Sequence, residues 1–261
     1  SIIGRIQRFT SPQAQVVMAD RYFVEQEIQA ATALLTGAEA HHLLHVMRGK
    51  IGDSVKLFDG LGKEYLAQIT RLGRRDVELA ILSTEQVDRE LPLRITLAVA
   101  LPPGDRQQWL VEKATELGVA RLVPLLTQRS GQVTDSMFNK LRRGVVEASK
   151  QCGRNRLMEI AAPVAWSDFA AVAHEAARYI AEIGVASLNP ATESARWRKE
   201  IVAAIGPVGD WTSEELAHAH SNNWEPIGLG PRILRVETAA ISLAAVLVAH
   251  VQGTPPADPP K

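Results

Sequence analysis

The strongest constraint on the fold is a change of hydrophobic pattern near residue 91. Before this point, apolar residues come in short runs typical of β-strands. After it, strand-like runs alternate with amphipathic helical stretches. Such alternation favours an α/β domain with a largely parallel sheet. The sequence therefore predicts a small β-domain at residues 21–90 followed by an α/β domain at residues 91–252.

The first domain is predicted to consist of short strands that close into a small β-barrel. The Asp-Gly-Leu-Gly sequence at 59–62 is expected to form a hairpin turn, and one helix, at 39–46, interrupts the strands. The charged segment 87–92 ends in proline and is typical of a linker. The expected strands are 22–24, 55–58, 65–69 and 77–81.

The second domain is predicted to alternate strands with helices. A capping box of Thr212 and Glu215 marks the start of one helix. The expected strands are 95–100, 122–126, 179–183, 201–205 and 226–229. The expected helices are 106–117, 136–151, 167–177, 212–221 and 236–251.

Composition excludes several classes of protein. The 29 basic and 29 acidic residues cancel, so no global field can gather a polyanion and any nucleic acid must meet a local patch. The single cysteine, Cys152, excludes an internal disulfide framework and fits a reducing compartment, so we expect a cytoplasmic protein. No apolar stretch is long enough to cross a bilayer, so no membrane partner is expected.

Both ends of the chain are expected to lie outside the folded domains. The first strand pattern comes just after Met18, which we expect to be the natural start. Residues 1–20 are therefore interpreted as an N-terminal extension. Residues 253–261 contain four prolines and are predicted to be a disordered tail.

Two glycine-containing turns follow predicted strands: Gly206-Pro-Val-Gly-Asp210, and the run 228–235, Gly-Leu-Gly-Pro-Arg-Ile-Leu-Arg. A nucleotide-like cofactor in an α/β domain needs this kind of close backbone approach. Neither spacing fits a dinucleotide fingerprint or a P-loop. Taken singly, each is most simply an ordinary turn. A nucleotide-dependent oxidoreductase or transferase would need glycines after the first strand of the sheet, where residues 98–106 offer only Pro-Pro-Gly.

Together with their flanks the two turns are far more specific. Gly206-Pro207 is followed by a Trp-Thr-x-x-Glu helix start at 211–215 and by Leu-Gly-Pro-Arg-Ile-Leu-Arg-x-Glu-Thr-Ala at 229–239. This order resembles the RsmE family, methyltransferases of the SPOUT superfamily that modify uridine at ring nitrogen 3 in 16S ribosomal RNA. The resemblance runs from residue 21 to about residue 251 and includes Arg21-Tyr-Phe-Val24, Val46-Met-Arg48, Leu57-Phe-Asp-Gly60, Glu116-Leu-Gly118 and Gln151-Cys-Gly-Arg154.

The resemblance implies a PUA-like RNA-binding β-barrel followed by a SPOUT-type α/β domain with a C-terminal trefoil knot. It also implies the cofactor S-adenosyl-L-methionine, a homodimer, and a substrate in small-subunit ribosomal RNA, either naked or within the assembled 30S subunit. The cofactor is expected to rest largely on backbone groups, with Pro207 and Pro231 fixing the loop shapes in advance. The expected cofactor-binding residues are Leu188, Gly206, Pro207, Gly209, Leu229, Gly230, Pro231, Ile233 and Leu234.

The catalytic hypothesis follows from the acceptor, an imide nitrogen whose proton is lost only above neutral pH. The site must remove that proton or stabilise the resulting anion. We assign anion stabilisation to Arg235 or Arg129. Glu237 is the carboxylate that matches the family motif, and it is the candidate for proton removal. The alternative is that Glu237 only stabilises a helix N-terminus by its charge. No metal is required, although His41, His42 and His45 lie close together in the sequence.

The segment 121–156 carries eight lysines and arginines against two acids, which is a plausible phosphate-binding surface. The alternative is a solvated helix face. The resemblance and the predicted loop positions indicate Arg129, Gln151 and Arg154 as RNA-facing residues. In the first domain, Arg48 and Tyr22 are candidates for contact by charge and stacking, unless Tyr22 belongs to the core. Cys152 is interpreted as structural, because methylation of a ring nitrogen needs no nucleophilic side chain from the enzyme.

Two departures from the family pattern leave an alternative open. The family usually has glutamate where this chain has Val208, and threonine where it has Val236. The loss of a carboxylate and a hydroxyl favours a second reading, a catalytically degenerate RNA-binding homologue. A methyltransferase that acts on a different RNA is a further alternative.

Overall fold

The computed structural model describes residues 20–25, 28, 31–172, 176–187 and 199–253. The chain forms two compact units. The first is built mainly from residues 28–57 and 65–84, and the second takes in residues 58–64 and the chain from residue 85. The predicted turn at 59–62 thus belongs with the second unit, because the N–H of Gly62 donates to the carbonyl of Asn155 at 3.1 Å and the N–H of Leu157 donates to the carbonyl of Gly60 at 3.1 Å.

A five-stranded sheet with the order β1-β3-β4-β5-β2 forms the N-terminal part. A short helix, α1 (Gly37–His41), runs into the π-helix η1 (His42–Val46), in place of the single predicted helix. The pattern analysis missed β2, whose four residues pair with β5 in an antiparallel register. The strands are β1 (Arg21–Phe23), β2 (Thr32–Leu35), β3 (Ser54–Phe58), β4 (Lys63–Leu72) and β5 (Val77–Gln86).

The second unit contains a seven-stranded sheet among its described residues, with the order β12-β10-β11-β6-β7-β8 and β9 paired to β7. Each pair of neighbouring strands in this sheet is parallel, which confirms the predicted α/β class. The strands are β6 (Arg94–Val99), β7 (Arg121–Leu126), β8 (Glu159–Ile160), β9 (Val164–Ala165), β10 (Ala177–Ala181), β11 (Glu200–Ile205) and β12 (Glu225–Ile227).

The helices of this unit start and end close to the predicted residues, with one exception. The capping box at Thr212 and Glu215 is present. Helix α4 ends at Ala171 instead of reaching residue 177, because Val172 is extended and Ala177 pairs with Ile201 as the first residue of β10. The helices are α2 (Arg106–Glu116), α3 (Asp135–Cys152), α4 (Trp166–Ala171), α6 (Ser213–Ser221) and α7 (Val236–Gly253).

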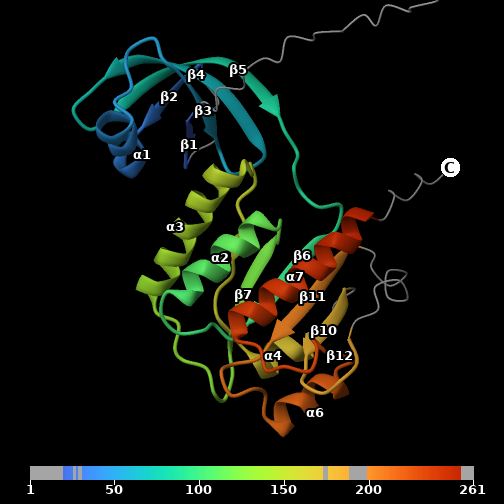
Figure 1. Cartoon of the computed structure of the whole chain (residues 1–261). Helices are drawn as coiled ribbons and strands as arrows, with labels where there is room; N and C mark the ends of the chain where they lie inside the picture. The colour runs from blue at the N-terminus through green and yellow to red at the C-terminus, as the bar shows by residue number, and fades with distance from the viewer. Residues whose placement is uncertain (1–19, 26–27, 29–30, 173–175, 188–198, 254–261) are drawn as a thin grey trace, which may run out of the picture. The chain divides into compact units, whose positions relative to one another are not determined.

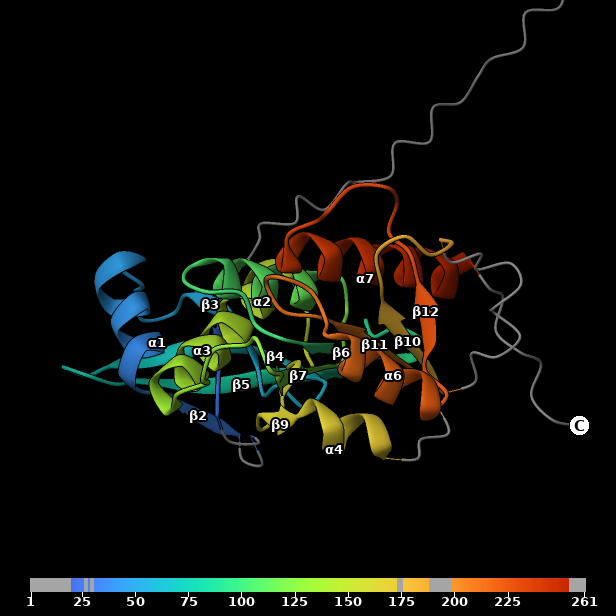
Figure 2. The ribbon, with the colours of Figure 1, turned by 90° about the horizontal axis from the view of Figure 1, so that it is seen from below.

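Helices cover both faces of the parallel sheet. One core cluster joins α2, α3 and α7 to the sheet, and another joins α4 and α6 to its opposite face. Figure 1 shows α2 and α7 lying along the strands, and Figure 2 shows α4 on the other side of the sheet. Neighbouring residues of one strand enter different clusters, as Leu97 and Ala98 do, because successive strand side chains point to opposite faces. Both faces are therefore buried, as expected for a parallel sheet.

The predicted N-terminal extension and C-terminal tail lie outside the described residues, except for Asp20 and for Gly253, which closes α7. In the described part of the chain, no helix combines the length and the apolar character that a membrane span requires.

Candidate active site

A pocket of about 640 Å³ opens beyond the carboxyl ends of β10, β11 and β12. Three loops form most of its wall, at 181–183, 205–210 and 229–236, and Arg106 at the start of α2 completes it. Its volume lies in the range of small-molecule sites. Ligands of open α/β sheets also bind at this edge. The pocket is therefore the candidate active site.

Two glycines stand where a side chain would not fit: Gly206 in the pocket wall, and Gly228 just before the wall loop 229–236. A Cβ at Gly228 would lie 2.1 Å from the carbonyl oxygen of Val185, and one at Gly206 would lie 2.9 Å from the indole nitrogen of Trp211. The N–H of Gly228 also donates to the carbonyl of Ala186 at 2.8 Å. The glycines therefore allow the loops beside the pocket to pack tightly.

Trp211 fixes the loop that follows β11. Its ring lies 4.6 Å from that of Trp166, and its Nε1 donates to the carbonyl of Ala181 at 3.0 Å. The carboxylate of Glu215 is buried and accepts from the N–H of Thr212 at 2.9 Å and from the N–H of Gln128 at 2.9 Å. The loops after β7, β10 and β11 are thus tied together before any ligand arrives.

Arg129 extends from the loop after β7 to the loop after β11. Its guanidinium donates to the carbonyl of Gly209 and, at 3.3 Å, to that of Asp210. Arg129 is not among the described residues that line the pocket. Its donors hold the loop in place, so we propose that Arg129 positions this loop; its contact with the reacting base and with RNA stays a prediction.

Three arginines line the pocket: Arg106, Arg232 and Arg235. Glu237 lies near Arg106 and does not line the pocket itself. Its Oε1 lies 3.9 Å from a guanidinium nitrogen of Arg106, its side chain is 8% exposed, and its Oε2 is buried with no hydrogen-bond partner among the described residues. The wall is therefore cationic beside the start of α7.

The pocket brings together most of the predicted cofactor-binding residues. Pro231 is not one of the pocket-lining residues, and Leu188 lies outside the described residues. Sequence reasoning missed Arg106, Arg232 and Glu182. Arg106 and Glu182 each follow the end of a parallel strand, which is the signal that could have found them. The predicted residues that line the pocket are Gly206, Pro207, Gly209, Leu229, Gly230, Ile233, Leu234 and Arg235.

Burial contradicts two of the predicted RNA contacts. Tyr22 is 1% exposed, and burial raises the pKa of its phenol well above the usual value, so it belongs to the core. Arg154 is 5% exposed, makes a two-pronged ion pair with Glu90 at 2.5 and 2.9 Å, and donates to the carbonyls of Thr115 and Val119. Both predictions are wrong, because these side chains hold the fold together.

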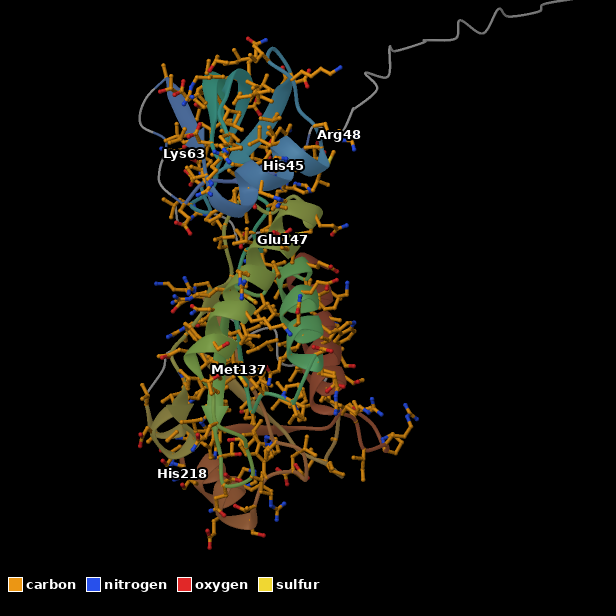
Figure 3. All side chains as sticks on the ribbon, turned by 90° about the vertical axis from the view of Figure 1, so that its left-hand side faces the viewer. His45, Arg48, Lys63, Met137, Glu147 and His218 are labelled. Atoms are coloured by element: carbon orange, nitrogen blue, oxygen red, sulfur yellow. The ribbon has the colours of Figure 1, made fainter. Side chains whose placement is uncertain are left out.

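The other three predicted RNA contacts, Arg48, Arg129 and Gln151, are exposed. Gln151 lies near the end of α3. Arg48 lies at the surface shortly after η1, three positions beyond His45 in the sequence, and has a φ of +55° (Figure 3). This left-handed backbone is costly for a residue with a side chain and is often found at functional positions. Arg48 and Gln151 therefore stay predictions.

Part of the positive charge of segment 121–156 is neutralised by acids from elsewhere in the chain. Lys140 pairs with Asp105 at 3.3 Å, and Arg121 pairs with Glu159 at 3.1 Å. These acids lie outside the segment, so a count along the chain leaves them out. Arg142, in contrast, stacks over Phe138 at 4.5 Å.

The histidines of the first unit do not form a metal centre with other ligands. The rings of His41 and His45 lie 4.7 Å apart. Within the described ranges, no group of three or more histidine, cysteine, aspartate or glutamate side chains is placed to hold a metal ion. Cys152 is exposed at the end of α3.

Comparison with known proteins agrees with this geometry. Residues 89–248 match the family model of the RNA methyltransferase domain, and residues 35–82 match that of the RNA methyltransferase PUA domain. The chain is 35% identical over 237 residues to the ribosomal RNA small subunit methyltransferase E of Synechocystis, covering 88% of this chain and 78% of that protein. The chain belongs to this methyltransferase family. The resemblance found in the sequence is thereby confirmed.

Solved structures of the family have the same fold. The ribosomal RNA small subunit methyltransferase E of Neisseria gonorrhoeae, bound to S-adenosyl methionine, has a TM-score of 0.81 at 28% identity, covering 88% of this chain and 97% of that chain. A Legionella pneumophila protein solved with bound SAM has a TM-score of 0.82 at 32% identity, with the same coverage. The SPOUT-type α/β domain and the PUA-like domain are confirmed, and the trefoil knot stays a prediction.

Proposed function

We propose that this protein transfers a methyl group from S-adenosylmethionine to ring nitrogen 3 of a uridine in 16S ribosomal RNA. The observation that carries the proposal is the pocket beyond β10, β11 and β12, walled by the two glycine-containing loops. Membership of the methyltransferase family supports the same reaction. Bound S-adenosyl methionine in the Neisseria structure supports the same cofactor.

The residues present fit this cofactor. Gly206, Gly209 and Gly230 line the pocket without side chains, and Gly228 allows close packing where a Cβ would clash. Leu229, Ile233 and Leu234 offer apolar surface for a purine. Arg232, which also lines the pocket, suits the carboxylate of a methionyl group. When bound, the cofactor supplies a methyl group on a sulfonium, which needs an acceptor held in line with the carbon–sulfur bond.

The protein must also help the uridine imide lose its proton. Arg235 lines the pocket and is exposed, so its guanidinium can donate to the two carbonyl oxygens that share the charge of the deprotonated base. Arg106 also lines the pocket and can share this task. Glu237 is buried near Arg106, so we assign it to the orientation of that guanidinium instead of to proton removal.

RNA contact by Arg48 and Gln151 is part of this proposal. Both side chains are exposed, and both match family motifs. The target base must leave its stack to reach the pocket, which favours a loop or an end of the RNA over a duplex. A ribosomal substrate and the single cysteine together support a cytoplasmic protein.

We further propose that two copies of the chain pair through α7. Among its described side chains, this helix turns Thr238, Ala245, Val246, Ala249 and His250 to solvent. An exposed face without lysine, arginine or acidic residues is unusual for a surface helix. Light scattering of the purified protein should give a mass twice that of the chain. The mass should fall to that of one chain when Val246 is replaced by glutamate.

The decisive test is incubation with labelled S-adenosylmethionine and either unmodified ribosomal RNA or 30S subunits, followed by mapping of the modified base. Methyl incorporation at ring nitrogen 3 of a uridine is expected. Incorporation at another position would contradict the proposal. Comparison of the two substrates shows whether the naked RNA or the assembled subunit is the acceptor.

One observation favours a second candidate, a degenerate RNA-binding homologue. Val208 is 61% exposed in the pocket wall where the family usually has glutamate, and Oδ1 of the nearby Asp210 accepts from the N–H of Trp211 at 2.8 Å. The Asp210 carboxylate is thus engaged with its own backbone. Calorimetry with S-adenosylmethionine separates the two candidates, because a degenerate pocket should not bind it.

A further inference from the structure

The pocket carries a carboxylate that the mechanism above does not use. Glu182 lies directly after β10 and lines the pocket. Among the described pocket-lining residues, Asp210 is the one other acid, and its Oδ1 already accepts from the N–H of Trp211. Glu182 is therefore the carboxylate best placed to meet a ligand.

Its position is fixed from several sides. The N–H of Glu182 donates to the carbonyl of Ile227 at 3.0 Å, which ties it to β12. The preceding carbonyl, of Ala181, accepts from Nε1 of Trp211 at 3.0 Å. Nε2 of His220, on α6, lies 3.2 Å from Oε2 of Glu182. A side chain held in this way loses little freedom when a ligand binds.

One oxygen of this carboxylate remains available. Within the described part of the chain, His220 makes the only hydrogen bond to it, through Oε2. The Glu182 side chain is 21% exposed, and the residue forms part of the pocket wall. An ionised carboxylate only accepts hydrogen bonds. The ligand group that meets Oε1 must therefore be a donor.

The parallel register indicates which donor this is. Ala181 pairs with Ile227, so Glu182 neighbours Gly228 and Leu229, the start of the loop proposed to hold the adenine. The arginines enter from α2 and from residues 232–235. In S-adenosylmethionine the ribose directly follows the adenine, and the methionyl carboxylate, which suits Arg232, lies beyond it.

We propose that the Glu182 carboxylate binds the ribose hydroxyls of the cofactor and that His220 positions it. This inference rests on the proposed function, because it assumes that the pocket takes S-adenosylmethionine. It adds a specificity-determining residue: a carboxylate that accepts from ribose hydroxyls selects against deoxyribose ligands, which leave it unpaired.

The test measures binding of two ligands to the full chain by calorimetry. S-adenosylmethionine carries the ribose and the amino acid, whereas 5′-methylthioadenosine carries the ribose without the amino acid. Replacement Glu182→Ala should weaken both ligands by the same factor, about tenfold or more, since a hydrogen bond to a charged group is lost. Glu182→Gln should weaken both less, because its amide oxygen still accepts.

The matched control is Glu214→Gln, an exposed acid on α6 outside the pocket wall, which should leave both affinities unchanged. His220→Ala should weaken both ligands by a few fold. Thermal unfolding of each variant identifies any loss that comes from the fold alone.

Three outcomes would overturn a specific part of the argument. If Glu182→Ala weakens S-adenosylmethionine but not methylthioadenosine, the carboxylate faces the amino acid and the ribose assignment fails. If neither affinity changes, Glu182 does not touch the ligand. If the unmodified protein binds neither ligand, the proposed function itself fails, which is a distinct result.

Discussion

The guanidinium of Arg106 lies 3.9 Å from the carboxylate of Glu237, and the two residues come from the first turns of different helices, α2 and α7. The distance is too long for a hydrogen bond but short enough for charge attraction. Because Arg106 lines the pocket and Glu237 does not, we propose that the acid acts on the reaction through the arginine. In this arrangement Arg106 is placed to contact the ligand, and Glu237 is placed to orient Arg106.

Replacement Arg106→Ala should reduce kcat about 100-fold, as loss of a donor to a developing anion does. Glu237→Gln should reduce kcat less and leave the affinity for S-adenosylmethionine unchanged, because its effect passes through Arg106. Steady-state kinetics with ribosomal RNA, together with calorimetry, measures both. The double variant should be no slower than Arg106→Ala; additive losses would show that Glu237 acts on its own.

Replacement Arg235→Ala should lower turnover far more than cofactor affinity, because the arginine stabilises the base anion in the transition state. Single-turnover methylation and cofactor titration give the two quantities. Arg232→Ala provides a comparison on the same loop. Equal losses in turnover and affinity would contradict the role assigned to Arg235.

Replacement Arg129→Ala should weaken cofactor binding by about tenfold, because it frees the carbonyls of Gly209 and Asp210 and loosens the loop after β11. Calorimetry measures the affinity, and the single-turnover rate at saturating cofactor should be nearly unchanged. A large fall in that rate with normal affinity would indicate that Arg129 contacts the reacting base.

Replacement Gly228→Ala should abolish cofactor binding, because its Cβ would lie 2.1 Å from the backbone oxygen of Val185 and the loop would have to move. Gly131→Ala is the matched control, since a Cβ there meets nothing within 4 Å. Cofactor titration and thermal unfolding of both variants check this. Normal binding by the Gly228 variant would exclude the loop from the cofactor site.

Replacement Arg154→Ala should destabilise the protein by about 3–5 kcal/mol, the usual result when one partner of a buried ion pair is removed. Urea unfolding measures the loss. Arg48→Ala, at an exposed position, should leave stability nearly unchanged and lower RNA affinity. If Arg154→Ala proves as stable as the unmodified protein, the buried pair with Glu90 does not contribute as the structure indicates.

Much of the fold could be predicted from the local sequence pattern. The capping box that starts α6 can be recognised from residues close together in the sequence. The same holds for the alternation of strands and helices that predicts a parallel sheet. The turns at 206–210 and 228–235 were also visible, because glycine and proline mark loop geometry locally. The predictions failed where an element depends on a partner that is distant in the sequence. Strand β2 forms by pairing with β5, and the end of α4 depends on the pairing of Ala177 with Ile201.

The site shows the same division. Arg154 looked like an RNA contact because its partner Glu90 lies 64 positions away, and the positive charge of segment 121–156 looked larger because Asp105 and Glu159 lie outside it. Only the tertiary structure brought Glu182 and Arg106 to one pocket. The sequence by itself determined the class of fold, the family and the two loops, because these depend on near neighbours. The partners of each charged side chain were decided by packing, because burial and ion pairing join residues that the chain keeps far apart.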